Sequence, residues 1–461
     1  MSSLDIFFQP TSIAIIGASR TPGEIGYEVL KNVKSTFNGQ IYPINPDVTE
    51  IENLITYNSI SNIEGQIDLA IILNPAKEVL SVLTECSKKG IKAAIIVSSG
   101  FSAKEEIKLL DYIKKLSKDR KMRVIGPSSL GLYSKELDML YLPKKRLKRP
   151  VDGYISFISQ SGGIGATLMD VAASEGIGIN KFIAVGSASD VDEIELLDYL
   201  GKDMQTRCIA IYVESMQNGK QLIEKAKKIV KDKPIIILKA GKGELGVAAA
   251  EEHSGHFSAK AKIYSAAFRQ AGIIEAQTVE DFFNHAKSLA NQPILKNNKI
   301  GIITNAGGFG VIAVDEASRL GLQLGELSKE TIKSMKTLPS HISKQNPLDL
   351  GGSASADMFQ TALNSLFKEK EISGIVCISL LQTPALEERV ISVIRESKLH
   401  GKPITVCMTG SEYTKKFAIK LEEYGIPVYN TPEKAVKSMN VLLTYNKILK
   451  SLKQYYLKNN L

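Results

Sequence analysis

The sequence lacks the features that mark membrane-spanning, secreted or disulfide-linked proteins. No apolar run in its 461 residues approaches the ~20 residues that a membrane-spanning helix needs. The first ten residues, MSSLDIFFQP, have neither the basic start nor the apolar stretch of a signal peptide, so we expect a cytoplasmic protein. The cysteines are too far apart for a zinc site or a disulfide framework, and we expect buried thiols at Cys86, Cys208, Cys377 and Cys407.

The chain also lacks a motif that would bind ATP by itself, because GxxxxGK[ST] occurs nowhere in it. Its net charge of +9 raises the question of a nucleic-acid partner. Only one dense basic run exists, KKRLKR at residues 144–149, and no aromatic residues are interleaved with it. An anionic small ligand or a solvated linker explains this run better, and we expect no nucleic acid and no membrane as partners.

The sequence does contain a regular alternation of apolar strands and amphipathic helices. From Ser12 onward, short apolar runs end in turns such as GAS, INP, LNP, SSG and GPSS, which is typical of a parallel sheet with right-handed crossovers. We predict an α/β protein with domains at 1–132, 151–292 and 298–445, a linker at 133–150 and a C-terminal helix at 446–461.

The most informative feature is a strand–turn–helix segment that occurs twice. The copies read FISQSGGIGATLMDVAASEG, ending at Gly176, and IITNAGGFGVIAVDEASRLG, ending at Gly321. In each copy a glycine-rich turn precedes a helix, so free backbone N–H groups and the positive helix end point at one spot. We therefore expect phosphate to be handled between two turns, Ser159, Gln160, Ser161, Gly162 and Gly163 in the first and Asn305, Ala306, Gly307 and Gly308 in the second.

A different glycine-rich turn, GASRTPGEIG at residues 17–26, follows the first strand, where a Rossmann-type domain holds a pyrophosphate. It is not GxGxxG, and the second strand ends with Asn45 where a nicotinamide enzyme would place a carboxylate. A nucleotide with a diphosphate is therefore favoured over a dinucleotide and over dehydrogenase function. A purely structural turn is the alternative.

Four motifs together resemble the CoA-binding domain of succinyl-CoA synthetases and ADP-forming acyl-CoA synthetases: GASRTPGEIG, YPINP, SSGF at 98–101 and GPSSLG at 126–131. The resemblance implies a Rossmann-like CoA-binding domain followed by two flavodoxin-like parallel-sheet domains. It also implies CoA contacts at Gly17, Ala18, Ser19, Gly23, Ile25, Asn45, Pro46, Asn74, Pro75, Ser98, Ser99, Gly100 and Pro127. The family's last turn usually reads GPNCLG, so Ser128 and Ser129 imply retuned or weakened CoA binding.

Two of the five histidines lie in EHSGHFSA, at His253 and His256. The family's counterpart reads roughly SHTGSLAG and is phosphorylated on its histidine, which implies that His253 accepts the phosphoryl group, as a neutral imidazole can. His256 stands where the family has serine and is a bystander or a helper. Glu214, after the strand CIAIYV, matches the glutamate that bonds the other ring nitrogen, although a solvated carboxylate at a helix start is the alternative.

The resemblance runs from about Ile6 to Met439 and implies the α subunit of an ADP-forming acyl-CoA (acetyl-CoA) synthetase. Such an enzyme reversibly converts acyl-CoA, ADP and phosphate to the acid, ATP and CoA through an acyl phosphate and a phosphohistidine. ADP or ATP with Mg²⁺ would then lie on an ATP-grasp β subunit in an α2β2 assembly, and no metal site is predicted on this chain. The alternative is a non-catalytic relative, a CoA or acyl-CoA sensor or a scaffold. The preferred acyl acid is left open.

Overall fold

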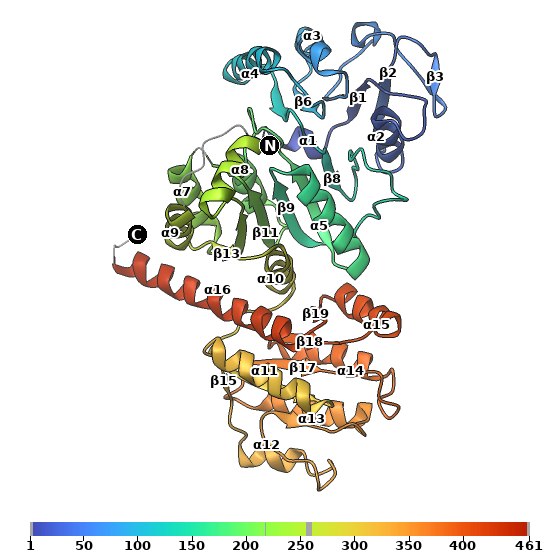
Figure 1. Ribbon diagram of the computed structural model, residues 1–461. Coiled ribbons are helices and arrows are strands. Elements are labelled where there is room, and N and C mark those ends of the chain that lie inside the picture. Colours follow the sequence, from blue (N-terminus) through green and yellow to red (C-terminus); the bar gives the residue numbers. More distant parts are fainter. Residues whose placement is uncertain (1–2, 217, 255–260, 459–461) are drawn as a thin grey trace. The chain divides into compact units, whose positions relative to one another are not determined.

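The computed structural model describes residues 3–216, 218–254 and 261–458, with the backbone alone at 251–254, 261 and 455–458. Three larger sheets run through the chain (Figure 1). The chain divides into two compact units. The first comprises Met1–Val171, Ile179–Ile229 and Ile237–Ala271, and the second comprises Ala172–Gly178, Val230–Ile236 and Gly272–Leu461.

The first sheet has five parallel strands in the order β2-β1-β5-β6-β7. Most of its strand residues are apolar and buried, as expected for a parallel sheet that is covered on both faces. The strand order reverses between β1 and β5, and open α/β sheets bind ligands at the carboxyl ends of the strands at such a point. The strands are β1 Ser12–Ile16, β2 Gln40–Ile44, β5 Leu69–Ile72, β6 Ala93–Ile96 and β7 Arg123–Ile125.

The helices of this sheet begin and end where local sequence signals predict. Helix α4 starts with a capping box, because the Ser102 hydroxyl accepts the Glu105 N–H while the Glu105 carboxylate accepts the Ser102 N–H. Helix α3 ends at Gly90, whose φ of 87° suits glycine. The elements are α1 Asp5–Phe8, α2 Ile25–Lys34, α3 Ala76–Lys89 and α4 Ala103–Lys118, with the short pair β3 Glu50–Ile51 and β4 Leu54–Ile55 and the 3₁₀ turn η1 Ile60–Asn62.

The second sheet has six strands in the order β13-β12-β11-β9-β10-β8. Strand β8 at its edge runs antiparallel to β10, whereas β10 and β11 both run parallel to β9. The strands are β8 Leu132–Ser134, β9 Asp152–Ser159, β10 Ile179–Ala184, β11 Cys208–Val213, β12 Ile235–Lys239 and β13 Ile274–Ala276. The helices are α5 Gly162–Glu175, α6 Glu193–Lys202, α7 Gly219–Ile229, α8 Glu244–Ser254 and α9 Ala261–Ala271.

The stretch at 133–150, predicted to be a linker, contains part of strand β8 and a buried carboxylate. Asp138 is fully buried and accepts a hydrogen bond of 2.8 Å from Nε of Arg149, the last residue of the basic run. A buried carboxylate requires such a partner, so at least this arginine is structural and not solvated.

The third sheet has the order β15-β14-β17-β18-β19, and β16 also pairs with β14. Its pairs are parallel, so the predicted fold class, an α/β protein with three successive parallel-sheet modules, is confirmed. The strands are β14 Lys299–Thr304, β15 Gln323–Leu324, β16 Leu348–Asp349, β17 Gly374–Ile378, β18 Ile404–Cys407 and β19 Val428–Tyr429. The helices are α10 Val279–Asn291, α11 Gly307–Arg319, α12 Lys329–Ser334, α13 Ala356–Lys368, α14 Val390–Ser397, α15 Glu412–Glu423 and α16 Pro432–Lys458, with the 3₁₀ turn η2 Lys398–His400.

Helix α16 begins earlier than the predicted C-terminal helix, at Pro432, and contacts α10 and α11. Its Tyr445 hydroxyl donates to the Val230 carbonyl at 2.9 Å, and its Asn446 side chain donates to the Leu295 carbonyl at 2.8 Å. These contacts bury its first half, so it packs as part of the second unit. None of the helices within the described ranges is long and apolar enough to cross a membrane.

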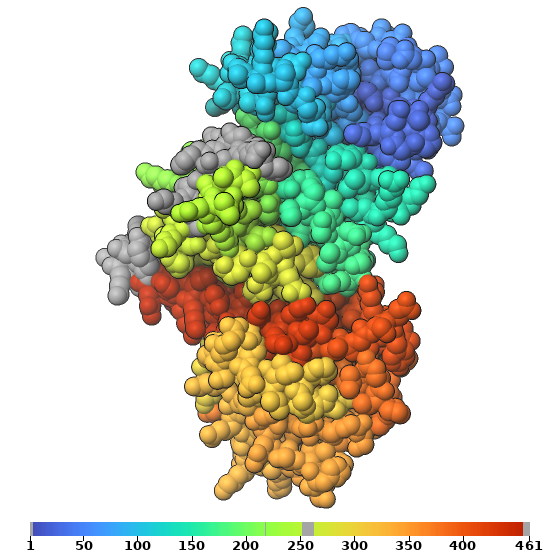
Figure 2. Space-filling view, in the orientation of Figure 1, coloured from blue at the N-terminus to red at the C-terminus, as the bar shows by residue number. Residues whose placement is uncertain are grey.

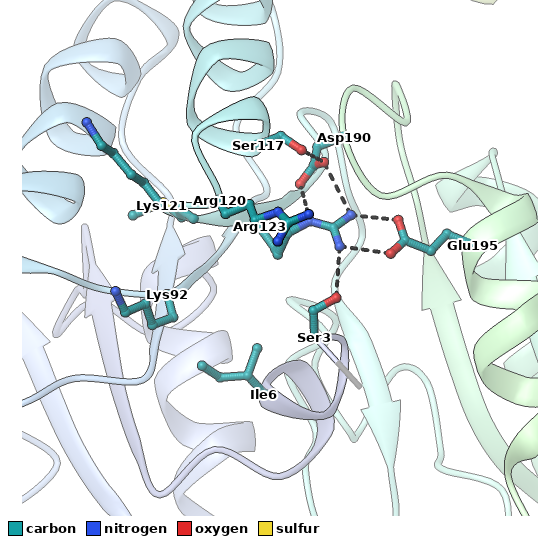
Figure 3. A pocket seen from close by; sticks show the side chains of 10 residues that line it. Ser3, Ile6, Lys92, Ser117, Arg120, Lys121, Arg123, Asp190 and Glu195 are labelled. Atoms are coloured by element: carbon teal, nitrogen blue, oxygen red, sulfur yellow. Dashed lines mark hydrogen bonds and ion pairs between the residues drawn. The ribbon is translucent and has the colours of Figure 1, made fainter. Parts of the chain in front are cut away.

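Within the first unit, the first and second sheets are joined through Arg123 at the start of β7 (Figure 3). Its guanidinium forms two hydrogen bonds with Asp190, at 3.0 and 3.2 Å, and two with Glu195, at 2.8 and 2.6 Å. A further N–H donates to the Ser3 hydroxyl at 3.0 Å. These carboxylates raise the pKa of Arg123, so the guanidinium is a permanent cation between the two sheets.

Candidate active site

The residues predicted to contact CoA lie at or after the carboxyl ends of the first sheet's strands. After β1 and β2, the N–H groups of Gly17 and Ala18 both donate to the Ile44 carbonyl at 3.2 Å, and the Asn45 side chain donates to the Ala18 carbonyl at 2.8 Å. Asn45 therefore holds the glycine-rich turn in place. The exposed members of the predicted set are Gly23, Ile25, Pro46, Pro75, Ser99 and Gly100, whereas Ala18, Ser98 and Pro127 are buried.

The glycine-rich turn requires glycine at Gly26, the second residue of α2. A Cβ there would lie 2.1 Å from the Gly17 carbonyl oxygen and 2.9 Å from the Ser19 nitrogen. The turn therefore folds back tightly over the helix start. The Ser19 hydroxyl bonds the Glu24 carboxylate and accepts the Thr21 N–H at 3.0 Å, which closes the turn on itself.

Asn74, after β5, carries the clearest sign of a ligand in this region. Its Oδ1 atom is buried and has no hydrogen-bond partner within the part of the chain that the structure describes. It lies 3.4 Å from the place where a Cβ on Gly17 would be, so it faces the turn. An unpaired buried acceptor is costly unless a ligand donor reaches it, which fits the hydroxyl and amide N–H groups of a CoA molecule.

The GPSSLG turn packs against the second sheet. The Pro127 carbonyl accepts the Ser187 N–H at 3.0 Å, and a Cβ on Gly186 would lie 2.1 Å from the same oxygen. Pro127 is therefore buried against residues 186–187 and does not present its ring to solvent. Ser128 is exposed and has a φ of 60°, a left-handed conformation in which the family's usual asparagine is less strained than serine.

In the first predicted phosphate turn, at the start of α5, the side chains serve the turn itself. The buried Ser159 hydroxyl donates to the Ser161 carbonyl at 2.7 Å. The Gln160 side-chain oxygen Oε1 accepts the N–H groups of Glu214 at 2.7 Å and Ser215 at 3.2 Å, and its side-chain amide donates to the Ser215 carbonyl at 2.8 Å. Gln160 therefore fixes the turn to the end of β11. An anion at this turn would be bound by backbone N–H groups at the start of α5 and not by these side chains.

The second predicted phosphate turn, at the start of α11, repeats this arrangement inside the second unit. The Thr304 hydroxyl donates to the Ala306 carbonyl at 3.0 Å, as Ser159 does in the first copy. Asn305 accepts the Leu380 N–H at 2.7 Å after β17, as Gln160 does after β11. No side chain caps α11, but an Asp349 carboxylate oxygen lies 2.5 Å from where a Cβ on Gly307 would stand, so this turn has an acidic neighbour that sequence reasoning missed.

Glu214 lies at the carboxyl end of β11 and is 7% exposed. The Tyr212 hydroxyl donates to its carboxylate at 3.2 Å, and the buried ammonium group of Lys239 donates to its carbonyl at 2.7 Å. Burial and the Glu214 charge raise the pKa of Tyr212, which keeps that hydroxyl protonated as a donor. The alternative of a solvated carboxylate is therefore wrong for Glu214.

The predicted phosphoryl acceptor, His253, belongs to α8, whose backbone is described to Ser254. The side chain of His253 and all of His256 lie outside the described residues. Helix α8 lies on the surface of the first unit (Figure 2). Leu245, its second residue, is 90% exposed.

Glu193, the first residue of α6, is a further acidic group at the first turn that sequence reasoning missed. Its side chain is 4% exposed and hydrogen-bonds Gln160. Burial raises its pKa to about 7. The only signal for it in the sequence is its place in the acidic stretch SASDVDEIE.

Among the described residues, no group of three or more His, Cys, Asp and Glu side chains is arranged to hold a metal ion. A cavity of about 860 Å³ lies around Lys92 and Arg120, at the amino ends of β6 and β7 (Figure 3). It is at the opposite end of the strands from the glycine-rich turn, so it is separate from the predicted CoA site.

Comparison with known proteins gives two family matches. Residues 11–135 match a CoA binding domain, and residues 152–289 match the succinyl-CoA ligase like flavodoxin domain. The alpha subunit of the ADP-forming acetate-CoA ligase II of Pyrococcus furiosus is 36% identical, over 93% of this chain and 95% of the relative. An ADP-forming acetate-CoA ligase of Methanocaldococcus jannaschii is 38% identical over 98% of this chain, which spans 64% of that longer protein.

Among solved structures, the acetyl-coenzyme A synthetase 1 of Ca. Korarchaeum cryptofilum, described as dinucleotide forming and in complex with phosphate and ADP, superposes with a TM-score of 0.90 at 32% identity. The match covers 98% of both chains. The similarity therefore includes all three sheets.

Proposed function

The chain belongs to the family of ADP-forming acetate-CoA ligase alpha subunits, and from this premise we propose the steps that its own residues carry out. The family's chemistry is that of an acid-thiol ligase that uses CoA and ADP. In our proposal the first sheet binds the CoA part of an acyl-CoA. The glycine-rich turn, with Asn45 and Asn74, lines that site, and the unpaired Asn74 Oδ1 supports it.

In the first step an oxygen of inorganic phosphate attacks the acyl carbonyl carbon of the thioester. The carbon–sulfur bond breaks, CoA leaves as the thiolate, and an acyl phosphate forms. In the second step an imidazole nitrogen of His253 attacks phosphorus, the bond between phosphorus and the acyl oxygen breaks, and the free acid leaves as a carboxylate. Glu214 would hold the proton on the other ring nitrogen and stabilise the charged ring.

The observation that carries this proposal is the setting of Glu214. Glu214 is 7% exposed at a strand end, and its carboxylate accepts a hydrogen bond from the Tyr212 hydroxyl. Its backbone is held on both sides, because its carbonyl accepts from Lys239 and its N–H donates to the Gln160 side chain. Gln160 belongs to the turn whose backbone N–H groups would receive phosphate.

In the last step an oxygen of the ADP β-phosphate attacks phosphorus of the phosphohistidine, the phosphorus–nitrogen bond breaks, and ATP forms. The relatives are named as alpha subunits, and we propose that the nucleotide lies on a partner β subunit of ATP-grasp type in an α2β2 assembly. In this proposal Mg²⁺ would accompany the nucleotide on that partner. The Methanocaldococcus jannaschii relative is longer than this chain, which spans 64% of it. The remaining part of that relative supports the placement of the nucleotide site on a separate subunit here.

The test is to incubate the purified chain with acetyl-CoA and ³²P-labelled phosphate and to assay for acid-labile label on histidine. We expect label in the wild type, none in His253→Ala and normal label in His341→Ala, which removes an exposed histidine elsewhere. Label that persists in His253→Ala would refute the assignment. Tight CoA binding without any label would favour the sensor alternative, for which the altered Ser128 turn is the motivating observation.

A further inference from the structure

Lys239, the last residue of β12, is buried to an unusual degree for a lysine, with 2% of its surface exposed. Burial lowers the pKa of this lysine, while the nearby Glu214 charge opposes that effect. An ammonium group is retained in such a place only when it is paired and hydrogen-bonded.

The contacts of the Lys239 ammonium group converge on the candidate active site. It donates to the Glu214 carbonyl at 2.7 Å, at the end of β11, and to the Ala240 carbonyl, where the chain leaves β12 toward α8. The third contact is the ring of Tyr264 in α9, whose centroid lies 4.7 Å from the nitrogen. Lys239 therefore touches the Glu214 strand and both ends of the stretch that contains His253.

Tyr264 extends the same connection. Its ring is buried, with 8% of the residue exposed, and its hydroxyl accepts the N–H of Met216 at 3.2 Å. Met216 lies two residues after Glu214. Because α8 and the residues between α8 and α9 stand between Ala240 and Tyr264, the segment with His253 is attached at both ends to the segment with Glu214.

A second buried lysine in this chain shows the contrast. Lys287 in α10 is 1% exposed, and its ammonium group donates to the Glu422 carboxylate at 2.7 Å, far along the chain from the predicted site residues. It is an internal ion pair of the second unit. The Lys239 ammonium instead bridges carbonyl groups at the carboxyl ends of two neighbouring strands, where functional residues of α/β proteins gather.

We propose that Lys239 is a positioning residue for phosphoryl transfer. Its ammonium group fixes the Glu214 backbone and, with Tyr264, both ends of the segment that presents His253. This inference rests on the proposed function, because it assumes that His253 is phosphorylated beside Glu214.

The experiment compares the full chain with Lys239→Met, Tyr264→Phe and the matched control Lys287→Met. The readouts are the initial rate of His253 labelling at saturating acetyl-CoA and phosphate, the Kd for CoA, and the thermal midpoint. We expect Lys239→Met to slow labelling roughly 10- to 100-fold, the loss typical of a displaced catalytic group, with CoA affinity unchanged. Tyr264→Phe should slow labelling severalfold. Lys287→Met should lower the thermal midpoint, but its His253 should be labelled at the wild-type rate.

Labelling of both Lys239→Met and Tyr264→Phe at the wild-type rate would overturn the inference while leaving the proposed function intact. Equal slowing in Lys239→Met and Lys287→Met, or a parallel loss of CoA affinity, would also overturn it, because either result indicates general destabilisation. If the wild-type protein takes up no label, both the proposed function and this inference are refuted. If Lys239→Met does not fold, the labelling rate of Tyr264→Phe tests the inference. That variant keeps the buried ring and removes only the hydroxyl that accepts the Met216 N–H.

Discussion

At the scale of single residues, buried ionisable side chains distinguish the first predicted phosphate turn from the second. Gln160 contacts Glu193 and the backbone of Glu214, and Lys239 donates to Glu214. The corresponding Asn305 bonds the backbone of Leu380 and the Thr383 hydroxyl. Both amides fix a turn to a neighbouring strand, but the first turn is also surrounded by groups whose protonation matters, as expected where chemistry takes place.

Glu193 leads to a pH prediction. Its pKa in the folded chain is about 7 against 4.5 for an unperturbed glutamate, so between these values the folded state holds a proton that the unfolded state has lost. Stability therefore falls as pH rises through this window, by up to about 3 kcal/mol for this group. Glu193→Gln keeps a neutral hydrogen-bonding side chain at all pH values and removes this loss.

We expect urea titrations to show a smaller fall in unfolding free energy from pH 5 to pH 8 for Glu193→Gln than for the wild type, by about 2–3 kcal/mol. The variant should be the more stable protein at pH 8. Parallel pH curves for the two proteins would contradict the assignment of this titration to Glu193.

At the scale of elements, the strand–turn–helix unit is the recurring structure of the chain. It occurs after β1, β9 and β14, each time with a turn that the first residues of a helix close. The two later copies use Ser159 and Thr304 in the same way, each hydroxyl donating to the carbonyl two residues on. The turn after β1 depends instead on close backbone approach at Gly26.

Gly26→Ala tests the first of these turns. The added methyl group would overlap the Gly17 carbonyl oxygen, so the turn must open, at a cost of about 1–3 kcal/mol. Because that turn borders the predicted CoA site, we expect CoA affinity, measured by calorimetry, to fall about tenfold or more. The matched control is Gly219→Ala at the start of α7, where a Cβ meets no atom within 4 Å, and CoA affinity there should not change. Wild-type affinity in Gly26→Ala would argue against CoA binding at this turn.

At the scale of the whole molecule, the Arg123 guanidinium is one of the groups that connect the two sheets of the first unit. Arg123 pairs with Asp190, whose side chain is 3% exposed, and with Glu195 on α6 (Figure 3). Asp190 also accepts the Val124 N–H at 2.8 Å, so the network reaches the backbone of β7. The pair therefore connects the sheet that would bind CoA to the sheet that carries Glu214.

Arg123→Met leaves Asp190 buried without its cation, and loss of one partner of a buried pair costs about 3–5 kcal/mol. We expect this variant to unfold at a clearly lower urea concentration, with loosening of the two sheets measured by amide hydrogen exchange. The control Lys202→Met breaks an exposed pair with Asp198 and should cost less than about 1 kcal/mol. Equal effects of the two substitutions would show that the network contributes little.

Much of the architecture could be read from local sequence. The alternation of strands and helices along the chain and the turn positions follow from apolar runs, capping residues and glycines that lie within a few residues of one another. In the segment at 133–150, only the structure shows that the buried carboxylate of Asp138 is paired with Arg149, a residue of the basic run. The first half of α16 is ordinary apolar sequence, and only the structure shows that it packs on α10 and α11.

The sequence by itself determined three α/β modules, their glycine-rich turns and the chemistry that a histidine, a glutamate and free N–H groups make available. Only the tertiary structure decided which side chains surround those turns. Gln160 meets Glu214 across 54 positions, Lys239 meets Glu214 across 25, and Arg123 meets Asp190 across 67. Such pairs leave no periodic trace in a single sequence, because burial and partnership arise only when distant strands are brought together in one sheet.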